Sequence, residues 1–371
     1  MVKEQRIVDE FLELVKVDSE TKYEREIADV LKEKFEALGL KVKEDDTTGV
    51  TGHGAGNLIC TLEGTANADP IYFTSHMDTV IPGNGVNPLI EDGYIKTDGT
   101  TILGADDKAG LAAMLEAVRV LKESNLDHGT VEFIITVGEE SGLIGAKALN
   151  REDITAKYGF ALDSDGKVGT VIVAAPTQSK IAATVHGKTA HAGVAPEKGV
   201  SAITIASKAI ANMPLGRIDE ETTANIGRIE GGSQTNIVCD RVDVLAEARS
   251  LAPEKMEHQS AAMKIAFEDA ANLMGGSVDI SIDIIYPGFK HKDGDPVVEV
   301  AKKAIAAIGR TAELKTSGGG SDANVIAGHG IPTINLGIGY EEIHTTNERI
   351  PVDELVKAAE LVVEIIKNAA N

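Results

Sequence analysis

Short apolar runs alternate with helical patterns at both ends of this chain. Four of these runs are rich in β-branched and aromatic residues and are short enough to be buried strands. They are Asn57–Leu62, Ile71–Ser75, Val131–Val137 and Tyr158–Leu162. A helical period fills Lys108–Lys122, between the second run and the third. Strands that alternate with helices pack as helices on a mostly parallel sheet, so the pattern predicts an α/β fold.

The middle of the chain has a different pattern. Lys180–His186 and Val242–Ala248 alternate apolar and polar residues, as strands with one face in water do. Helical periods cover Ala202–Met213 and Pro253–Leu273, and a further strand covers Val278–Tyr286. These elements suggest the order β-α-β-β-α-β, of which the named runs supply three of the four strands, and predict a compact α+β domain of the ferredoxin-like kind with its helices on one face of a sheet.

The alternation of helices and strands returns after this middle region, in Pro296–Ile308, Thr333–Leu336 and Val352–Asn368. Pro176 and Pro287 mark the ends of the middle region. A chain of 371 residues is also longer than one core normally supports. We therefore expect the α+β domain to be inserted into the α/β domain. The expected boundaries are 1–176 and 288–371 for the α/β domain and 177–287 for the insert.

The composition excludes several classes of partner. With 58 acidic and 36 basic residues, the net charge of −22 argues against binding to nucleic acid. No apolar stretch is long enough to cross a bilayer, and the N-terminus lacks the apolar segment of a signal peptide. Two cysteines, Cys60 and Cys239, exclude a disulfide framework. We predict a cytoplasmic protein that binds neither membrane nor nucleic acid.

Acids and histidines follow the apolar runs closely. His76 and Asp78 come at the end of one run, Glu139 and Glu140 follow another, and Asp163 follows a third. In a similar way, His344 lies in the loop after Thr333–Leu336. Because the carboxyl ends of strands form the site edge of an open α/β sheet, these groups are expected to meet there.

A pair of adjacent acids, Asp106 and Asp107, stands at the start of the helical stretch in TILGADDKAGLAAMLEA (Thr101–Ala117). Alone, such a pair is ordinary, because acids cap helices and favour the first turn. Taken with the acids and histidines at the strand ends, it suggests a site for two divalent ions. Zinc binds imidazole nitrogen and carboxylate oxygen, and two ions about 3.5–4 Å apart can share one carboxylate.

The combination resembles the M20 family of di-zinc metallopeptidases, most closely its peptidase T (tripeptidase) branch. The resemblance spans essentially the whole chain, and its stretches occur in the order of the family. The stretches are SHMDTV (Ser75–Val80), DGTTILGADDKAG (Asp98–Gly110), GEESGLIGAK (Gly138–Lys147), ALDSD (Ala161–Asp165), GKTAHAG (Gly187–Gly193) and IHTTNERI (Ile343–Ile350). The resemblance implies a zinc-exopeptidase-type α/β catalytic domain whose inserted domain serves as a lid and for dimerisation.

The resemblance also implies a set of metal ligands. Asp106 bridges two zinc ions, with Co²⁺ or Mn²⁺ as alternatives in one of the sites. His76 and Asp163 complete one site, and Glu140 and His344 complete the other.

The same resemblance gives catalytic roles to two further acids. Glu139 is the general base that activates a water bridging the metals. Asp78 orients His76 through the second ring nitrogen, and Asp107 keeps an ordinary place at the start of the helix.

Four residues outside this set resemble substrate-contacting groups of the family. His191 is expected to stabilise the oxyanion, Arg249 to bind a substrate carboxylate, and Asn236 and Gly319 to contact the substrate. His191 as a surface imidazole and Arg249 in a surface ion pair remain the alternatives. The tripeptidase branch usually has an arginine where Ser317 stands.

These expectations lead to a zinc-dependent exopeptidase that removes N-terminal residues from short peptides and forms a homodimer through the insert. An amidohydrolase acting on N-acyl amino acids, or a carboxypeptidase, is the alternative within the same chemistry. A non-catalytic peptide-binding protein is the alternative from another class, which the presence of Glu139 and all five ligand positions disfavours.

Overall fold

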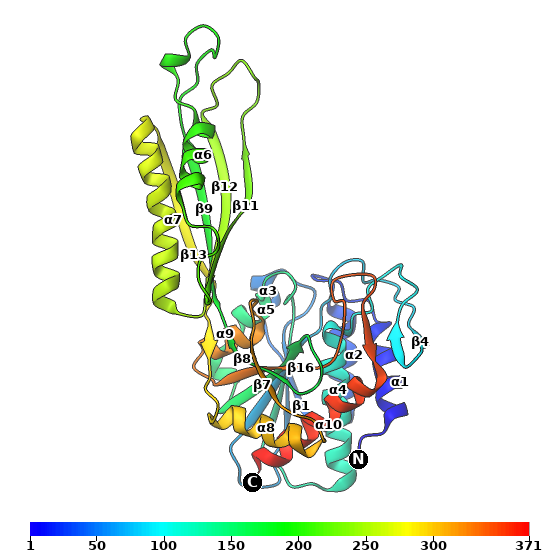
Figure 1. Ribbon diagram of the computed structural model, residues 1–371. Helices are drawn as coiled ribbons and strands as arrows, with labels where there is room; N and C mark the ends of the chain where they lie inside the picture. Colours follow the sequence, from blue (N-terminus) through cyan, green and yellow to red (C-terminus); the bar gives the residue numbers. More distant parts are fainter. Residues whose placement is uncertain (371) are drawn as a thin grey trace. The chain divides into compact units, whose positions relative to one another are not determined.

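The structure, a computed structural model, describes residues 1–370 and divides into two compact units (Figure 1). The first unit comprises Met1–Ala174, His291–Thr316 and Ser321–Asn371. The second comprises Ala175–Lys290 and Ser317–Gly320. Along the chain, the second unit therefore falls between stretches of the first. The short glycine-rich segment Ser317–Gly320 groups with the second unit, which the sequence pattern did not indicate.

The first unit is built on a mixed sheet with strand order β1-β2-β6-β3-β7-β16-β8, and β15 pairs with β8. Its four central strands, β6, β3, β7 and β16, are parallel, whereas β1, β2 and β8 join antiparallel. β15 pairs parallel with β8, so the prediction of a mostly parallel sheet is confirmed, with antiparallel pairings at β1, β2 and β8. The strands are β1 (Lys41–Glu44), β2 (Leu58–Leu62), β3 (Ile71–His76), β6 (Val131–Thr136), β7 (Tyr158–Ser164), β8 (Thr170–Ala175), β15 (Glu313–Thr316) and β16 (Thr333–Gly337).

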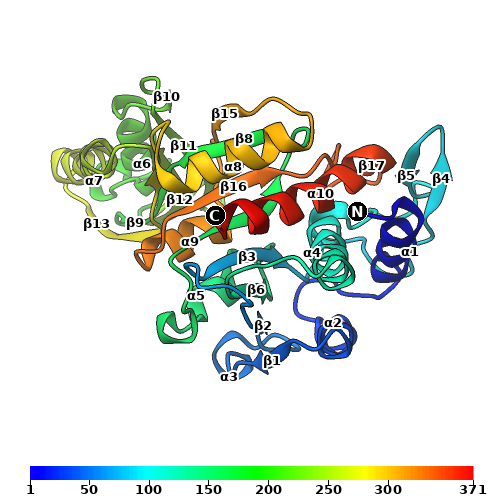
Figure 2. The same cartoon turned by 90° about the horizontal axis from the view of Figure 1, so that it is seen from below.

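Helices cover both faces of this sheet (Figure 2). The long helices α4 and α10 lie on one face, and the short helices α5 and α9 lie on the other. Because both faces are covered, the central strands are buried along almost their whole length rather than on alternate residues. The helices are α1 (Glu4–Val15), α2 (Arg25–Ala37), α3 (Thr48–Thr51), α4 (Ala105–Ser124), α5 (Ile144–Ala148), α8 (Pro296–Ala307), α9 (Asp322–Gly328) and α10 (Val352–Ala369).

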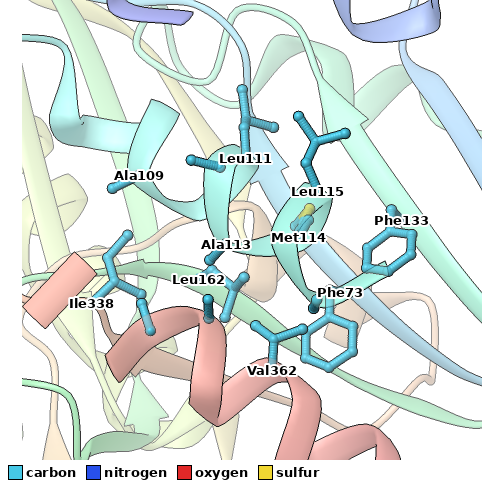
Figure 3. Close-up of a cluster of buried hydrophobic side chains, with 14 of the residues drawn as sticks. Phe73, Ala109, Leu111, Ala113, Met114, Leu115, Phe133, Leu162, Ile338 and Val362 are labelled. Carbon is cyan, nitrogen blue, oxygen red and sulfur yellow. The ribbon is translucent and has the colours of Figure 1, made fainter. Parts of the chain in front are cut away.

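The core of the first unit lies between α4 and the central strands (Figure 3). Phe73 of β3 stacks on Phe133 of β6 and on Phe160 of β7, with ring centroids 5.9 and 5.5 Å apart. Met114 and Leu115 of α4 lie in the same cluster. Nearly every residue of α4 up to Leu121 is buried, which explains why the helix is apolar on most sides and small-residue-rich. This packing fixes the start of α4 relative to the strands.

A small three-stranded sheet, β17-β5-β4, also belongs to the first unit. It joins the hairpin of β4 (Leu89–Glu91) and β5 (Tyr94–Lys96) to β17 (Arg349–Pro351). It therefore anchors the segment that follows His344.

The second unit is an antiparallel sheet with two helices on one face (Figure 1). The strand order is β10-β11-β12-β9-β13. Apart from the two-residue β10, the element order is β-α-β-β-α-β, which matches the ferredoxin-like expectation. Strand β11 is mostly exposed, which is why its sequence lacks a clear apolar alternation. The elements are β9 (Thr177–His186), α6 (Ala202–Asn212), β10 (Gly216–Arg217), β11 (Thr222–Gly231), β12 (Arg241–Ser250), α7 (Pro253–Met274), β13 (Ser277–Tyr286) and β14 (Phe289–Lys290).

None of the helices within residues 1–370 has the length and apolarity that a bilayer crossing requires.

Candidate metal centre

The four parallel strands of the first unit each deliver a polar group to one edge of the sheet. Strand β3 ends at His76, and β6 ends at Thr136, three residues before Glu139. Asp163 is the second-last residue of β7, and His344 lies in the loop that follows β16. Since these strands run in the same direction, their carboxyl ends meet, and the groups converge there.

Asp106 stands between the two histidines. Its Oδ1 lies 3.0 Å from His76 Nε2, and its Oδ2 lies 3.3 Å from His344 Nε2. His344 Nε2 is also 2.9 Å from Glu140 Oε1, and His76 Nε2 is 4.0 Å from Asp163 Oδ1. One carboxylate thus faces two separate sets of donors, one through each oxygen.

The chain turns sharply to place this carboxylate. Gly104, at the N-cap of α4, has a φ of 75°, a left-handed conformation that favours glycine. Asp106 and Asp107, although within the first turn, have non-helical backbone angles. The start of the helix is therefore shaped to present Asp106 rather than to continue a regular first turn.

Asp107 lies in the first turn of α4, the place expected for it, but its carboxylate does not cap the helix. The helix has no side-chain cap hydrogen bond, and the Asp107 carboxylate is fully buried with no hydrogen-bond partner among the described residues. Instead, one of its oxygens falls within 4.8 Å of donor atoms of His76 and Asp163. Burial and the charge of Asp163 raise the pKa of Asp107. Asp107 therefore adds a further carboxylate to the buried cluster.

The electrostatics of the cluster are those of a site for cations. Burial opposes ionisation of Asp106, but the hydrogen bonds with His344 and His76 outweigh it and lower the pKa of Asp106. Hydrogen bonds with Asp106 and Glu140 raise the pKa of His344 to about 10. Burial and neighbouring carboxylates raise the pKa of Asp163 and of Glu139. So many buried acids need compensating positive charge.

The donor set fits divalent ions. His76, Asp106 and Glu140 can each offer one ligand atom within 4.8 Å of the others, as can His76, Asp107 and Asp163. Imidazole nitrogens mixed with carboxylate oxygens suit zinc and its first-row neighbours.

Asp78 supports the cluster in a different manner from the expected one. His76 Nδ1 donates to the Asp78 backbone carbonyl at 2.9 Å, while the Asp78 carboxylate lies 3.6 Å from that nitrogen. The carboxylate accepts instead from the backbone N–H groups of Glu139 and Glu140, at 3.0 and 3.3 Å. Asp78 therefore holds both the histidine and the turn that carries the two glutamates.

Four polar residues at this site were not among the predicted site residues. The Tyr340 hydroxyl donates to Asp163 Oδ1 at 3.2 Å, and Thr136 donates to buried Asp322. Glu348, also buried, accepts from backbone N–H groups at the start of α4. A signal for Glu348 was present, since it lies in the stretch Ile343–Ile350 that was quoted with His344.

The four expected substrate contacts all belong to the second unit. His191 and Asn236 are exposed neighbours, since Ala192 N donates to Asn236 O. Arg249 is engaged by Glu247, at 3.0 Å from its Nε, and by the Gly318 carbonyl, at 3.1 Å from Nη1. Gly319 donates to Ser317 Oγ within the glycine-rich segment.

The sequence matches the description Peptidase family M20/M25/M40 over residues 72–368. The chain belongs to peptidase family M20/M25/M40. It is therefore a hydrolase of the peptidase type, as the sequence predicts.

Known relatives of this M20 chain cover its full length. It is 73% identical over 370 residues to the uncharacterized protein YqjE of Bacillus subtilis, with all of both chains covered. It is 29% identical to peptidase T of Geobacillus thermodenitrificans, with 98% of each covered.

Two solved structures share the whole fold. The aminopeptidase PepT of Bacillus cereus is 72% identical, with a TM-score of 0.97 and full coverage of both chains. A tripeptidase of Staphylococcus aureus is 53% identical, with a TM-score of 0.97, covering 100% of this chain and 99% of its own.

Proposed function

We propose that this chain is a metal-dependent exopeptidase that removes the N-terminal residue of short peptides, with tripeptides as its main substrates. The observation that carries the proposal is the position of Asp106, whose two oxygens face His76 and His344 at 3.0 and 3.3 Å. A carboxylate with one oxygen toward each histidine could be a ligand of two adjacent metal ions. The two similar solved structures, an aminopeptidase and a tripeptidase, support the choice of substrate.

Five residues are proposed to hold two divalent ions. Asp106 is shared, His76 and Asp163 serve one ion, and Glu140 and His344 serve the other. We propose zinc because the set mixes imidazole with carboxylate, with Co²⁺ or Mn²⁺ as alternatives in one site. When bound, such a pair supplies the Lewis acidity that polarises a peptide carbonyl and activates water.

Glu139 is the proposed general base. It precedes the ligand Glu140, and its backbone N–H is held by the Asp78 carboxylate at 3.0 Å. Burial and the charge of Asp163 raise the pKa of Glu139, which brings the carboxylate closer to the range where a base both accepts and returns a proton. Glu139 would take a proton from water and pass it to the amine that leaves.

Residues of the second unit are proposed to handle the substrate. The resemblance supports His191 as the donor to the developing oxyanion, and Arg249, Asn236 and Gly319 as groups that contact the peptide. Arg249 suits a C-terminal carboxylate because a guanidinium can bind it through two parallel hydrogen bonds.

We also propose a homodimer formed through the second unit and a cytoplasmic location. Free Cys60 and Cys239 are both buried thiols, which is consistent with a reducing compartment. Light scattering coupled to gel filtration tests the dimer, because a single species with the mass of one chain would contradict it.

A substrate panel tests the proposed function. Metal-reconstituted protein is incubated with a free tripeptide, the same tripeptide N-acetylated, the same tripeptide amidated at its C-terminus, and N-acetyl and N-succinyl amino acids. Chromatography should detect the N-terminal amino acid released from the free tripeptide, and chelator should stop its release. Hydrolysis of the N-acyl amino acids alone would establish the amidohydrolase alternative instead. Release of the C-terminal residue would establish a carboxypeptidase.

A further inference from the structure

Glu348 is a buried carboxylate outside the proposed ligand set. Its hydrogen bonds join the segment that carries His344 to the segment that carries Asp106. Its side chain belongs to the segment just after His344, and the residue is 1% exposed. Its Oε2 accepts from the N–H groups of Leu103 and Gly104 at 2.8 and 2.7 Å. Its Oε1 accepts from the N–H group of Asp106 at 3.0 Å.

The N–H groups of Gly104, the N-cap residue, and of Asp106 belong to the start of α4, where a helix has no partners of its own for them, and Leu103 directly precedes the cap. The helix supplies no side-chain cap at this end. Glu348 takes the place of a cap from more than 240 residues away along the chain. An anionic acceptor is also the group that the positive end of a helix dipole favours.

The loop that carries His344 and Glu348 is also held by hydrogen bonds of its own. Glu341 and Arg349 exchange backbone hydrogen bonds of 2.8 and 3.1 Å, which close the loop that contains His344. Glu348 N donates to Thr345 O at 3.1 Å within that loop. Arg349 then continues into β17, which pairs with β5. The Glu348 side chain thus leaves a closed loop and bonds directly to the turn that presents Asp106.

We infer that Glu348 is a positioning residue that sets the separation between Asp106 and His344, and so the affinity for the ion these two residues share with Glu140. The inference rests on the proposed metal site. His344 is half exposed and lies 3.3 Å from Asp106 Oδ2. Within residues 1–370, hydrogen bonds and ion pairs join the two segments only through Glu348 and through this His344–Asp106 contact. Groups that orient ligands in this way typically change metal affinity by about 10–100-fold.

The chain contains a matched control. Glu132 is 2% exposed and also accepts from backbone N–H groups, those of Thr155 and Ala156, at 3.1 Å. It lies near the start of β6, at the opposite end of that strand from Thr136 and Glu139. Glu132→Gln therefore also removes a buried carboxylate that accepts hydrogen bonds from backbone N–H groups, but it does so away from the metal centre.

The test is calorimetric titration of Zn²⁺ into metal-stripped wild type, Glu348→Gln and Glu132→Gln, with thermal unfolding of each metal-free protein. Both variants should unfold at lower temperature than wild type. Only Glu348→Gln should lose affinity for one of the two ions, by about 10–100-fold, and excess Zn²⁺ should restore most of its tripeptide turnover. Glu348→Asp, which keeps the charge but shortens the side chain, should lose less.

Two results overturn the inference: unchanged affinity for both ions in Glu348→Gln, or an equal loss in Glu132→Gln. If Glu348→Gln does not fold, Glu348→Asp decides, and unchanged affinity in that variant overturns the inference. Failure of wild type to bind two ions is a different outcome, because it contradicts the proposed metal site itself.

Discussion

The two units of this protein differ in how deeply they bury the residues predicted to be functional. In the first unit, Asp78 and Asp106 are 0% and 6% exposed, and the groups around them bond to one another or to backbone N–H groups. In the second unit, His191 and Asn236 are exposed, and Arg249 already has an ion-pair partner in Glu247. Burying several acids without enough positive charge is costly, so such a cluster indicates a bound cation. Exposed polar groups are solvated by water and give no such indication. The metal centre can therefore be argued from geometry, and the substrate contacts rest on resemblance.

The largest expected effect is the loss of the shared carboxylate. Asp106→Ala removes the one group that faces both histidines, so both ions should be lost. Tripeptide turnover should fall by at least about a thousandfold, as the loss of several kcal/mol of metal assistance implies. Metal analysis and a tripeptide assay measure the two effects, with Asp29→Ala, an exposed acid of α2, as the control. Retention of both ions by Asp106→Ala would remove the basis for a shared ligand.

A second prediction tests whether the second unit handles substrate. Arg249→Ala should leave the metal content unchanged and lower kcat/KM for a free tripeptide by about 10–100-fold, the value of a charge-assisted hydrogen bond. The effect should be much smaller for a tripeptide amidated at its C-terminus. Arg241→Ala is the matched control, because Arg241 lies on the same strand and pairs with Asp243 at the surface. Equal losses on both peptides would mean that Arg249 does not bind the carboxylate.

The third prediction concerns pH and has a smaller effect. A histidine must be neutral to bind a metal, and hydrogen bonds with Asp106 and Glu140 raise the pKa of His344 to about 10. A raised pKa means that the proton is still bound at neutral pH, so the metal must displace it. The apparent metal affinity should therefore rise with pH, by about tenfold per pH unit for each displaced proton. Calorimetry in buffers of different ionisation enthalpy counts these protons, and binding without proton release would contradict the assignment.

The difference between the units also explains what could be predicted from sequence. Groups at the ends of apolar strands, such as His76 and Asp163, are predictable because strand direction brings those ends together. The helices and most strands follow from apolar periodicity, and the exposed β11 lacks it. The burial of Asp107 within the cluster and the hydrogen bonds of Tyr340 and Glu348 were not predictable, because they depend on how distant segments pack. The antiparallel edges of the sheet also follow from connections that no local pattern encodes.

The central claim is that the first unit holds two metal ions and that Glu139 supplies the base beside them. The most direct test is Glu139→Gln, measured for metal content and for tripeptide hydrolysis in the same preparation. The account predicts two divalent ions per chain, as in wild type, and a loss of turnover of about 10²–10⁴-fold. Near-normal turnover in this variant, with both ions bound, would contradict it.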